Sequence, residues 1–356
     1  MIIFIIKDDC RVTDNEVKKE INDVFTAFKL NNENNNNHRQ IDFELSRNIQ
    51  EDGWEKIFDK KDLIIWRRRI VIEDNDKSTS SDSVELYEYK VLGRISDVTP
   101  IEFYQTQIDL DFRKQWDYLV ISIEIIDKDK TSKTELIRWF TKFPYPLYPR
   151  EYVFVRRHCI EPDEKFLILI SRAIPQIDLS KFSKKSNKNP QSVRVDQYKS
   201  NMVIIPHSDF EKPGLDYVMQ YYDVNKANIP KMAYSWMASS GLPDYIEKLH
   251  KATLQLKKIN QKISKNNKNV LSGFEMFYLK EMQTDTIIDN ETNHVNDPEE
   301  SKNKNDEIIN EKNIKIDETK NENTKENPNN HNNENETNSQ INLILEQDKD
   351  NNIEQN

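Results

Sequence analysis

Glycine and cysteine are scarce in this 356-residue sequence, and each scarcity excludes a class of functional site. The five glycines lie at least 27 positions apart, whereas a GxGxxG nucleotide-binding turn or a P-loop needs glycines within about six residues of each other. Cys10 and Cys159 are too few for a disulfide framework or a cysteine-based zinc site, which favours a reducing, intracellular compartment. No apolar run approaches the ~20 residues of a membrane-spanning helix.

Motifs of catalysis and of metal binding are missing as well. No two of the six histidines lie within five residues of each other, which excludes HExxH and zinc-finger pairs, and no GxSxG motif occurs. His158 and Cys159 are neighbours in a strand-like segment, but adjacent strand residues point to opposite faces and cannot act as a base and its nucleophile. We therefore expect a protein that is not an enzyme and that needs neither a metal nor a cofactor.

The formal net charge of −10 belongs to the C-terminal tail. Residues 285–356 carry 19 acidic and 7 basic side chains, which leaves a net charge of +2 on the remainder of the chain. Since this remainder is nearly neutral and has no dominant basic block, nucleic acid is not expected as a partner. The tail contains 20 Asn and no aromatic residue, so it buries too little apolar surface to offset its ordering entropy and is predicted to be disordered.

An amphipathic segment precedes the body of the chain. Val17, Ile21, Val24, Phe25 and Phe28 recur at helical spacing, which predicts a helix that either docks on the body or contacts a partner or a membrane. An Asn-rich tract follows and begins a predicted linker. The predicted organisation is an N-terminal segment at 1–30, a linker at 31–47, a globular domain at 48–262, a short segment at 263–284 and the tail at 285–356.

The body is predicted to be an α+β domain with an antiparallel sheet. A helical stretch is expected at 53–58, and Thr99 followed by Pro100 predicts the start of another helix. Strands are predicted at 63–70, 84–95, 119–127, 134–142, 151–161, 165–173, 192–205 and 215–223. Pro230 begins the last predicted element, and Pro243 restarts it as a long terminal helix with one apolar face. Short turns suit antiparallel pairing, so the expected fold is a curved sheet gripped by the last helix.

Arg113 and Asp117 stand four residues apart in the segment DFRKQWD (111–117), so they face each other on a helical turn. One interpretation is an ordinary surface ion pair worth about 0.2–0.5 kcal/mol. The neighbouring Phe112 and Trp116 favour a partly buried segment, in which the guanidinium needs its carboxylate and has donors left for a phosphate. The local pattern leaves both interpretations open.

Trp139 and Tyr152 flank the turn-rich segment FPYPLYPR (143–150). A hairpin centred on this segment places the two rings almost opposite each other on neighbouring strands. Such a pair is either core packing or two walls of an aromatic box for a quaternary ammonium. Tyr198 is a candidate third wall, but strict alternation puts charged residues such as Arg194 on its face, so periodicity leaves its role undecided.

These residues and their flanking segments resemble the START (StAR-related lipid transfer) domain family, and within it the phosphatidylcholine-transfer subgroup. The resemblance covers residues 50–260 approximately, and it is carried by Gly53-Trp54-Glu55, DVTPIEFYQTQIDLDFRKQWD (97–117), RWFTKFPYPLYPREYVFVRR (138–157), VRVDQYKSNMVI (193–204) and SWMASSGLPDYIEKLHKATL (235–254). It implies a helix-grip fold, in which a curved antiparallel sheet and a long C-terminal helix enclose one lipid. The polar loop at 180–190 and the Asn-rich linker and tail depart from the family pattern.

The resemblance also implies a binding site. In family members that bind phosphatidylcholine, an Arg–Asp pair meets the head group with its Arg on the phosphate, and three aromatic residues surround the choline. The matching positions are Arg113 and Asp117 for the pair, and Trp139, Tyr152 and Tyr198 for the aromatic residues. The implied function is non-enzymatic transfer of a single phospholipid between membranes. The alternative is a lipid-sensing or scaffolding module that binds lipid without shuttling it.

The resemblance further implies transient contact with a membrane surface, and we expect the protein to act as a monomer. The N-terminus lacks the Arg-rich, acid-poor character of a mitochondrial presequence. The cytoplasm is therefore the expected location, peripheral to membranes, with association with mitochondria as an alternative.

Overall fold

The computed structural model describes residues 6, 10–28, 30–32, 39–48, 53–70, 86–143, 147–162, 165–174, 177, 191–224 and 241–266. All of them belong to one compact unit, Met1–Phe274, and the second unit, Glu275–Asn356, lies wholly outside the described residues. The expectations for most of the Asn-rich tract, for the loop at 180–190 and for the tail therefore concern positions that the structure does not describe.

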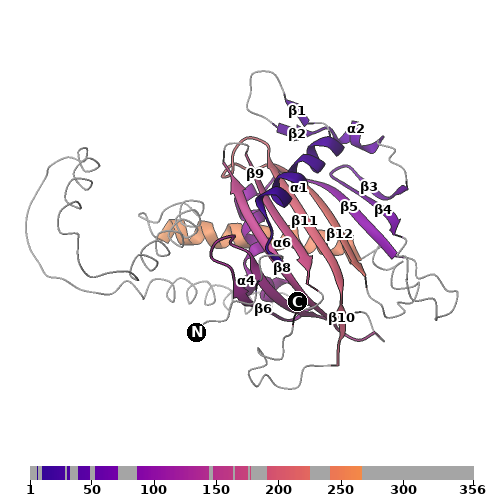
Figure 1. The fold of residues 1–356 in the computed structure, drawn as a ribbon. Helices are drawn as coiled ribbons and strands as arrows, with labels where there is room; N and C mark the ends of the chain where they lie inside the picture. The colour runs from indigo at the N-terminus through magenta and orange to yellow at the C-terminus, as the bar shows by residue number, and fades with distance from the viewer. Residues whose placement is uncertain are drawn as a thin grey trace, which may run out of the picture. The chain divides into compact units, whose positions relative to one another are not determined.

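One large antiparallel sheet forms the centre of the described unit (Figure 1). Its path runs β3-β4-β5-β12-β11-β9-β8-β7-β6, a short strand β10 pairs in parallel with β8, and β1 pairs with β2 in a separate small sheet. The strands are β1 (Leu30–Asn32), β2 (Arg39–Ile41), β3 (Trp54–Lys60), β4 (Leu63–Ile70), β5 (Leu86–Ile95), β6 (Val120–Lys128), β7 (Glu135–Thr141), β8 (Arg150–Glu161), β9 (Phe166–Ala173), β10 (Val193–Val195), β11 (Gln197–Pro206) and β12 (Leu215–Val224).

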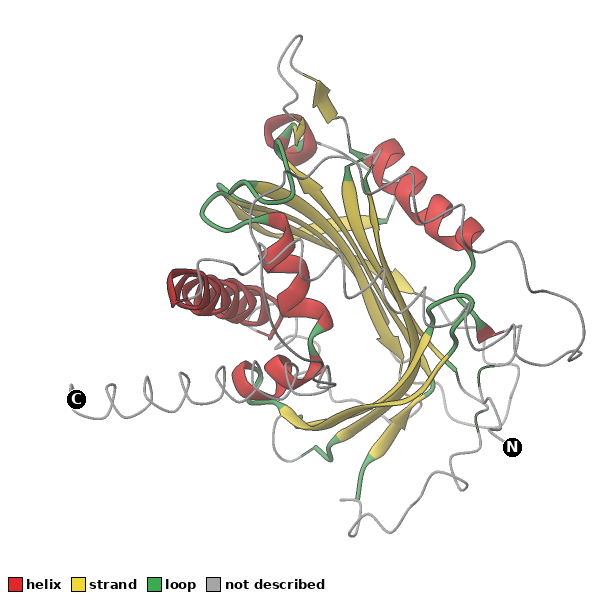
Figure 2. Ribbon diagram, turned by 90° about the vertical axis from the view of Figure 1, so that its left-hand side faces the viewer, coloured by secondary structure: helices red, strands yellow, loops and turns green. Residues whose placement is uncertain are grey.

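Helices lie on both faces of the curved sheet (Figure 2). The convex face carries α1 (Asp14–Ala27), and the concave face carries α3 (Pro100–Ile108), α4 (Leu110–Trp116) and α6 (Leu242–Asn266), while the short α2 (Phe43–Arg47) follows β2. This arrangement of a curved antiparallel sheet with a long C-terminal helix confirms the predicted α+β helix-grip fold. None of the described helices is long and apolar enough to cross a membrane.

The helix α3 begins where the sequence predicts it. The Thr99 hydroxyl accepts the N–H of Glu102 at 3.2 Å, and the Glu102 carboxylate accepts the N–H of Thr99 at 2.9 Å. Pro100 occupies the first turn, where its missing N–H costs no hydrogen bond. These reciprocal bonds satisfy two N–H groups that the helix itself leaves without a partner. The residue at which α3 begins is therefore determined by its local sequence.

Residues 54–58 belong to the strand β3 and Gly53 to the turn before it, so the helix expected at 53–58 is wrong. β3 pairs with β4, with a register shift between Lys56 and Phe58. This irregularity breaks the alternation of the strand, so the apolar residues Trp54, Ile57 and Phe58 recur at i, i+3 and i+4, which is the spacing of a helix. Pairing with β4 thus overrides a local pattern that is ambiguous over so short a segment.

The N-terminal helix α1 packs on the convex face, across β9 and β11 in the view of Figure 1. Val17, Ile21 and Val24 are buried in a core that they share with sheet residues such as Val203 and Ile205. Three ion pairs also join α1 to the sheet. They link Glu20 to Lys199 at 2.6 Å, Glu16 to Arg172 at 3.0 Å, and Asp14 to Arg157 at 2.6 Å. Docking on the body is therefore confirmed, and the apolar side of α1 is already covered.

Residues 39–47, expected to belong to a linker, form β2 and α2. Asp216 accepts the N–H of Ile41 at 2.7 Å, and Arg94 donates to the Ile41 carbonyl at 2.8 Å. Ile41 is 1% exposed, and the Arg94 guanidinium lies 4.6 Å from the ring centroid of the buried Phe43. Composition alone does not separate this stretch from the Asn-rich tract before it, because its order depends on contacts with residues far along the chain.

Candidate functional site

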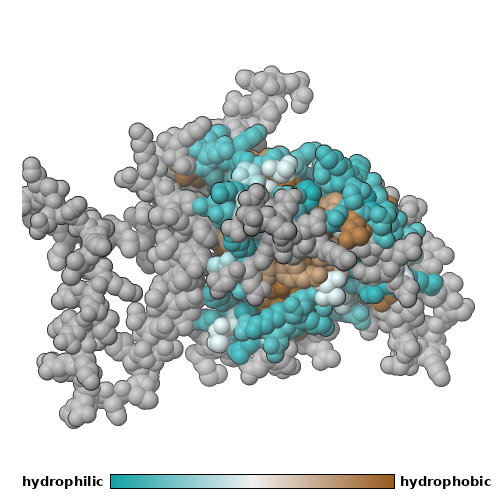
Figure 3. Space-filling model, turned by 90° about the horizontal axis from the view of Figure 1, so that it is seen from above, coloured by the Kyte–Doolittle hydropathy of each residue, from teal (hydrophilic) through white to brown (hydrophobic). Residues whose placement is uncertain are grey.

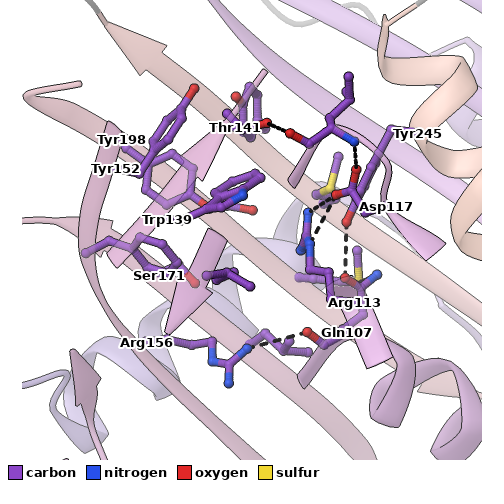
Figure 4. A pocket seen from close by; sticks show the side chains of 18 of the residues that line it. Gln107, Arg113, Asp117, Trp139, Thr141, Tyr152, Arg156, Ser171, Tyr198 and Tyr245 are labelled. Atoms are coloured by element: carbon purple, nitrogen blue, oxygen red, sulfur yellow. Dashed lines mark hydrogen bonds and ion pairs between the residues drawn. The ribbon is translucent and has the colours of Figure 1, made fainter. Parts of the chain in front are cut away.

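A cavity lies between the concave face of the sheet and the helices α3, α4 and α6 (Figure 4). Most of its wall is apolar or aromatic, and the residues that line it include Leu110, Ile123, Phe154, Leu169, Met202 and Met219. Seen from above, the molecule also shows hydrophobic residues gathered between hydrophilic rims (Figure 3). A mostly apolar cavity with a small number of polar groups is the usual form of a site for a small organic ligand.

The register of the sheet brings the predicted aromatic residues together on one side of this cavity (Figure 4). Trp139 of β7 pairs directly with Tyr152 of β8, and their rings stack with centroids 5.1 Å apart. Tyr198 of β11 meets Tyr152 edge to face, with centroids 5.2 Å apart. All three residues line the cavity, so strands that are distant in the sequence contribute to one aromatic group.

A break in the strand explains why Tyr198 faces the cavity. Asp196 separates β10 from β11, so the alternation of side chains does not continue across it. Arg194 is in register with Glu151 and forms an ion pair with it at 3.4 Å. Glu151 is the neighbour of Tyr152 and therefore points to the opposite face of β8. Because the strand is interrupted at Asp196, Arg194 and Tyr198 do not have to share a face, and Tyr198 can face the cavity.

Arg113 and Asp117 form a largely buried ion pair at the C-terminal end of α4. The Nε and Nη2 groups of Arg113 donate to Asp117 Oδ2 at 3.3 and 3.2 Å, and the two side chains are 14% and 8% exposed. Burial by itself lowers the pKa of Arg113, but Tyr245 and Asp117 outweigh it, so the pKa is raised and the guanidinium stays charged. The pair is therefore not an ordinary surface contact, and its guanidinium retains donors for an anion.

Trp139 lies between Tyr152 and Arg113 (Figure 4). The guanidinium carbon of Arg113 is 4.8 Å from the centroid of the Trp139 ring, and Tyr152 stacks on the same ring. The Nε1–H of Trp139 is buried and has no hydrogen-bond partner among the described residues. A buried donor without a partner costs free energy, so this N–H is available to an acceptor on a ligand.

Tyr221 and Asp223, both on β12, extend this group, and sequence reasoning missed them. Tyr221 lines the cavity and meets Tyr198 edge to face with centroids 6.1 Å apart. Tyr152 Oη donates to Asp223 Oδ2 at 2.7 Å, and burial raises the pKa of both groups. The register of β12 against β11 would have identified these residues, because it pairs Asp223 directly with Tyr198.

Tyr245 of α6 contributes to the charged part of the cavity from the helix side. Its hydroxyl donates to Gln107 Oε1 at 3.2 Å, and its ring centroid lies 5.6 Å from the guanidinium carbon of Arg113. The Trp116 ring packs against it with centroids 6.1 Å apart. The apolar spacing of the terminal helix identifies Tyr245 only as part of the buried face, whereas the structure places it against a buried charge.

A second buried charge cluster holds the cavity wall to α3. Arg156 lines the cavity and donates to Glu135 Oε2 at 2.7 Å and to the carbonyl of Ile108, the last residue of α3, at 3.0 Å. Burial by itself raises the pKa of Glu135, but Arg156 and His158 outweigh it and hold the pKa far below its usual value. Because α4 follows α3 directly, this cluster anchors the junction from which Arg113 is presented to the cavity.

His158 and Cys159 point to opposite faces of β8, as the sequence predicts. His158 Nδ1 lies 2.8 Å from the hydroxyl of Tyr104, whereas Cys159 packs against the core that α1 covers. Burial raises the pKa of Cys159 to about 12, so the thiol is neutral and a poor nucleophile. The two residues therefore do not form a nucleophile and its base.

Comparisons with known proteins relate this geometry to a family. The family model described as START domain matches residues 42–259. The chain is 40% identical over 214 residues to StAR-related lipid transfer protein 7, mitochondrial, of Mus musculus, a match that covers 60% of this chain and 52% of that protein. It is 36% identical over 265 residues to the Homo sapiens protein of the same name, covering 72% of this chain and 67% of that protein.

Two further similarities are more distant. Phosphatidylcholine transfer protein of Bos taurus is 33% identical over 177 residues, which cover 49% of this chain and 76% of that protein. The crystal structure of human STARD10 matches with a TM-score of 0.46 at 16% identity, covering 63% of this chain and 85% of that one. The matched region spans about half the length of the Mus musculus relative. Since the family model covers more than half of the chain, this protein belongs to the START domain family.

Proposed function

We propose that this protein binds one phospholipid, phosphatidylcholine, in its cavity and transfers it between membranes without making or breaking a bond. The observation that carries the proposal is the buried, charged Arg113 beside a group of tyrosine rings in an otherwise mostly apolar cavity. This combination fits the three parts of the ligand, which are an anionic phosphate, a cationic choline and two apolar chains.

Arg113 and Trp139 are the proposed partners of the phosphate. Asp117 accepts from Nε and Nη2 of Arg113, which leaves Nη1 and the second Nη2 hydrogen for phosphate oxygens. The buried Nε1–H of Trp139 is a further donor beside this guanidinium. Because Asp117 already balances the charge of Arg113, the phosphate is best accommodated together with a cation of its own, which choline supplies.

The tyrosine rings are the proposed partners of the choline, and Tyr221 takes the place around the choline that the resemblance gives to Trp139. Tyr152, Tyr198 and Tyr221 line the cavity, and Tyr198 meets each of the other two rings edge to face. A quaternary ammonium has no N–H, and a ring face contributes about 0.5–2 kcal/mol to its binding. Trp139 stacks on Tyr152 and borders Arg113, so it joins the choline end of the site to the phosphate end.

Enclosure of the acyl chains follows from the energetics of lipid transport. A phospholipid with two chains has about 30 methylenes, each worth ~0.8 kcal/mol when it is removed from water, so unassisted desorption faces a barrier on the order of 20 kcal/mol. The apolar part of the cavity wall offers the chains an environment similar to that of the membrane. The helix α6, which lies over the cavity, is the element whose displacement would admit the lipid at a membrane surface.

The names of the relatives support the same ligand and location. One relative is named for phosphatidylcholine transfer and two are named as mitochondrial lipid transfer proteins. We therefore include in the proposal transient contact with membrane surfaces and association with mitochondria as well as a cytoplasmic pool. In this proposed function the protein is a monomer that carries its lipid without enzymatic activity and without a nucleic acid partner.

Two measurements on the full-length chain test this proposal. Native mass spectrometry of the purified protein should show one bound phosphatidylcholine, and a vesicle assay should show catalytic exchange of that lipid between two vesicle populations. Lys114→Gln, at an exposed neighbour of Arg113 on α4, is the matched control and should leave both results unchanged. Bound lipid without exchange would favour the sensing or scaffolding module instead. The absence of any co-purifying phospholipid would contradict both functions.

A further inference from the structure

Asp223 is a carboxylate on the concave face of the sheet that takes no part in the proposed phosphate site. It is the direct cross-strand partner of Tyr198, and it accepts a hydrogen bond from Tyr152 Oη at 2.7 Å. Tyr221 lies two residues earlier on β12, and residues two apart in a strand share a face. Three tyrosine side chains are therefore grouped around one acidic side chain.

The carboxylate of Asp223 forms no ion pair with a lysine or arginine in the part of the chain that the structure describes. Burial raises its pKa, and the hydroxyls of Tyr152 and Tyr221, together with the more distant Arg150, compensate only in part. A hydroxyl donor stabilises the ionised form of a carboxylate less than a lysine or arginine cation would stabilise it. The negative charge at this position is therefore incompletely balanced, which suits a positively charged ligand.

Asp216, on the same strand, shows how the protein balances a structural aspartate. Arg94 donates to its two carboxylate oxygens at 2.7 and 2.9 Å, and His207 Nε2 lies 3.0 Å from one of them. Burial by itself would raise the pKa of Asp216, but Arg94 and His207 outweigh it and lower the pKa. Asp216 thus receives its cation from the protein, whereas Asp223 has the hydroxyl groups of Tyr152 and Tyr221, whose side chains line the cavity.

We propose that Asp223 is a specificity-determining residue that supplies the counter-charge for the quaternary ammonium of the bound lipid. The inference rests on the proposed function, since it places the choline in the space bounded by Tyr152, Tyr198 and Tyr221. A trimethylammonium group cannot donate a hydrogen bond to a carboxylate, so its recognition needs ring faces around it and negative charge behind them. The hydrogen bond to Asp223 holds the Tyr152 ring in place. It also draws the hydroxyl proton of Tyr152 towards the carboxylate, which makes the ring richer in electrons.

The variant Asp223→Asn keeps the shape of the side chain and removes its charge. The full-length wild-type and variant proteins are incubated with vesicles that contain equal amounts of phosphatidylcholine and phosphatidylglycerol, whose head group has no cation. Native mass spectrometry then quantifies the lipid bound to each protein. We expect the ratio of bound phosphatidylcholine to phosphatidylglycerol to fall about tenfold in Asp223→Asn.

Asp216→Asn is the matched control for this experiment, because it removes the charge of an aspartate on the same strand that has its partners within the protein. It should lower the melting temperature and leave the lipid ratio unchanged. An unchanged ratio in Asp223→Asn would overturn the proposal, and an equal loss of both lipids would do so too, because it would show a structural role alone.

Tyr152→Phe provides a second test that does not depend on the folding of Asp223→Asn. It removes the hydroxyl that contacts Asp223 and keeps the ring, so the ratio should fall about two- to threefold. A ratio equal to that of the wild type would contradict the proposal. The outcomes also separate this inference from the proposed function. If the wild-type protein binds no phosphatidylcholine, the proposed function is wrong. A wild-type preference for phosphatidylcholine that both variants retain rejects only the role of Asp223.

Discussion

The guanidinium carbon of Arg113 lies 4.8 Å from the centroid of the Trp139 ring, so a cation of the protein itself is already stacked on this aromatic side chain. The same ring stacks on Tyr152. Trp139 therefore connects the pair Arg113–Asp117 to the tyrosines, and its Nε1–H is the polar atom that it offers to a ligand. This relationship divides the proposed site into a phosphate end at Arg113 and Trp139 and a choline end at the tyrosines.

Arg113→Gln is expected to abolish phosphatidylcholine binding. Gln is uncharged and offers one amide in place of two parallel donors, so the buried phosphate would lose its charged hydrogen-bond partner at a cost of about 3–5 kcal/mol. Bound lipid and transfer between vesicles should both fall by more than about a hundredfold. Adding Asp117→Asn removes the carboxylate left unpaired and should restore the melting temperature without restoring binding. Normal transfer by a well-folded Arg113→Gln protein would refute the phosphate assignment.

Trp139→Phe is expected to weaken the binding of phospholipids whether or not their head group carries a cation. Phe keeps an aromatic face for Arg113 and Tyr152 but lacks the N–H. The loss of one hydrogen bond to the phosphate corresponds to about 0.5–1.5 kcal/mol. Competition against a fluorescent lipid should show the same fall in affinity for phosphatidylcholine and for phosphatidylglycerol. A loss confined to phosphatidylcholine would instead show that the ring face contacts the choline.

Glu135 is expected to contribute to the loss of stability in acid. Its pKa in the folded protein is lowered from the ordinary value of 4.5, so its stabilising contribution is present above that pH and is lost as the pH falls below it. Glu135→Gln leaves Arg156 buried without its anion, which should reduce the free energy of unfolding at neutral pH by about 3–5 kcal/mol. The variant should also lose less stability between neutral and acid pH. Urea unfolding across a pH series checks both effects, and parallel pH curves for the two proteins would argue against this role.

Deletion of residues 1–28 is expected to destabilise the domain and to promote aggregation. Val17, Ile21 and Val24 cover apolar residues of the convex face, and each such buried side chain contributes about 1.5–3 kcal/mol. The melting temperature and light scattering of the truncated chain report the two effects. Replacing the exposed Lys18 with Gln is the control and should change neither. A truncated chain that melts at the wild-type temperature would show that the convex face does not need its helix.

Short-range signals predicted a large part of this fold and part of its site. Thr99 and Pro100 predicted the start of α3, and the hairpin after β7 predicted that Trp139 lies opposite Tyr152. Both features depend on residues close together in the chain, where the period of a helix or a strand determines which side chains meet. The same argument brought Arg113 and Asp117 face to face, but it did not determine their burial, which depends on packing by elements such as Tyr245 of α6.

Apart from β3 and the break between β10 and β11, the sequence by itself determined the order of helices and strands in the body, and it determined the pairs of residues that meet within a turn or a hairpin. Only the tertiary structure decided that Tyr198 and Tyr221 line the cavity together with Tyr152, and that Asp223 accepts the hydrogen bond of Tyr152. A shift of one residue in the register of a strand turns every side chain to the other face while the backbone hydrogen bonds can still form. The choice between registers depends on burying both faces of the sheet at once, with α1 on the convex face and the cavity on the concave face. Local periodicity carries no information on that choice, because the packing that decides it involves residues far apart in the chain.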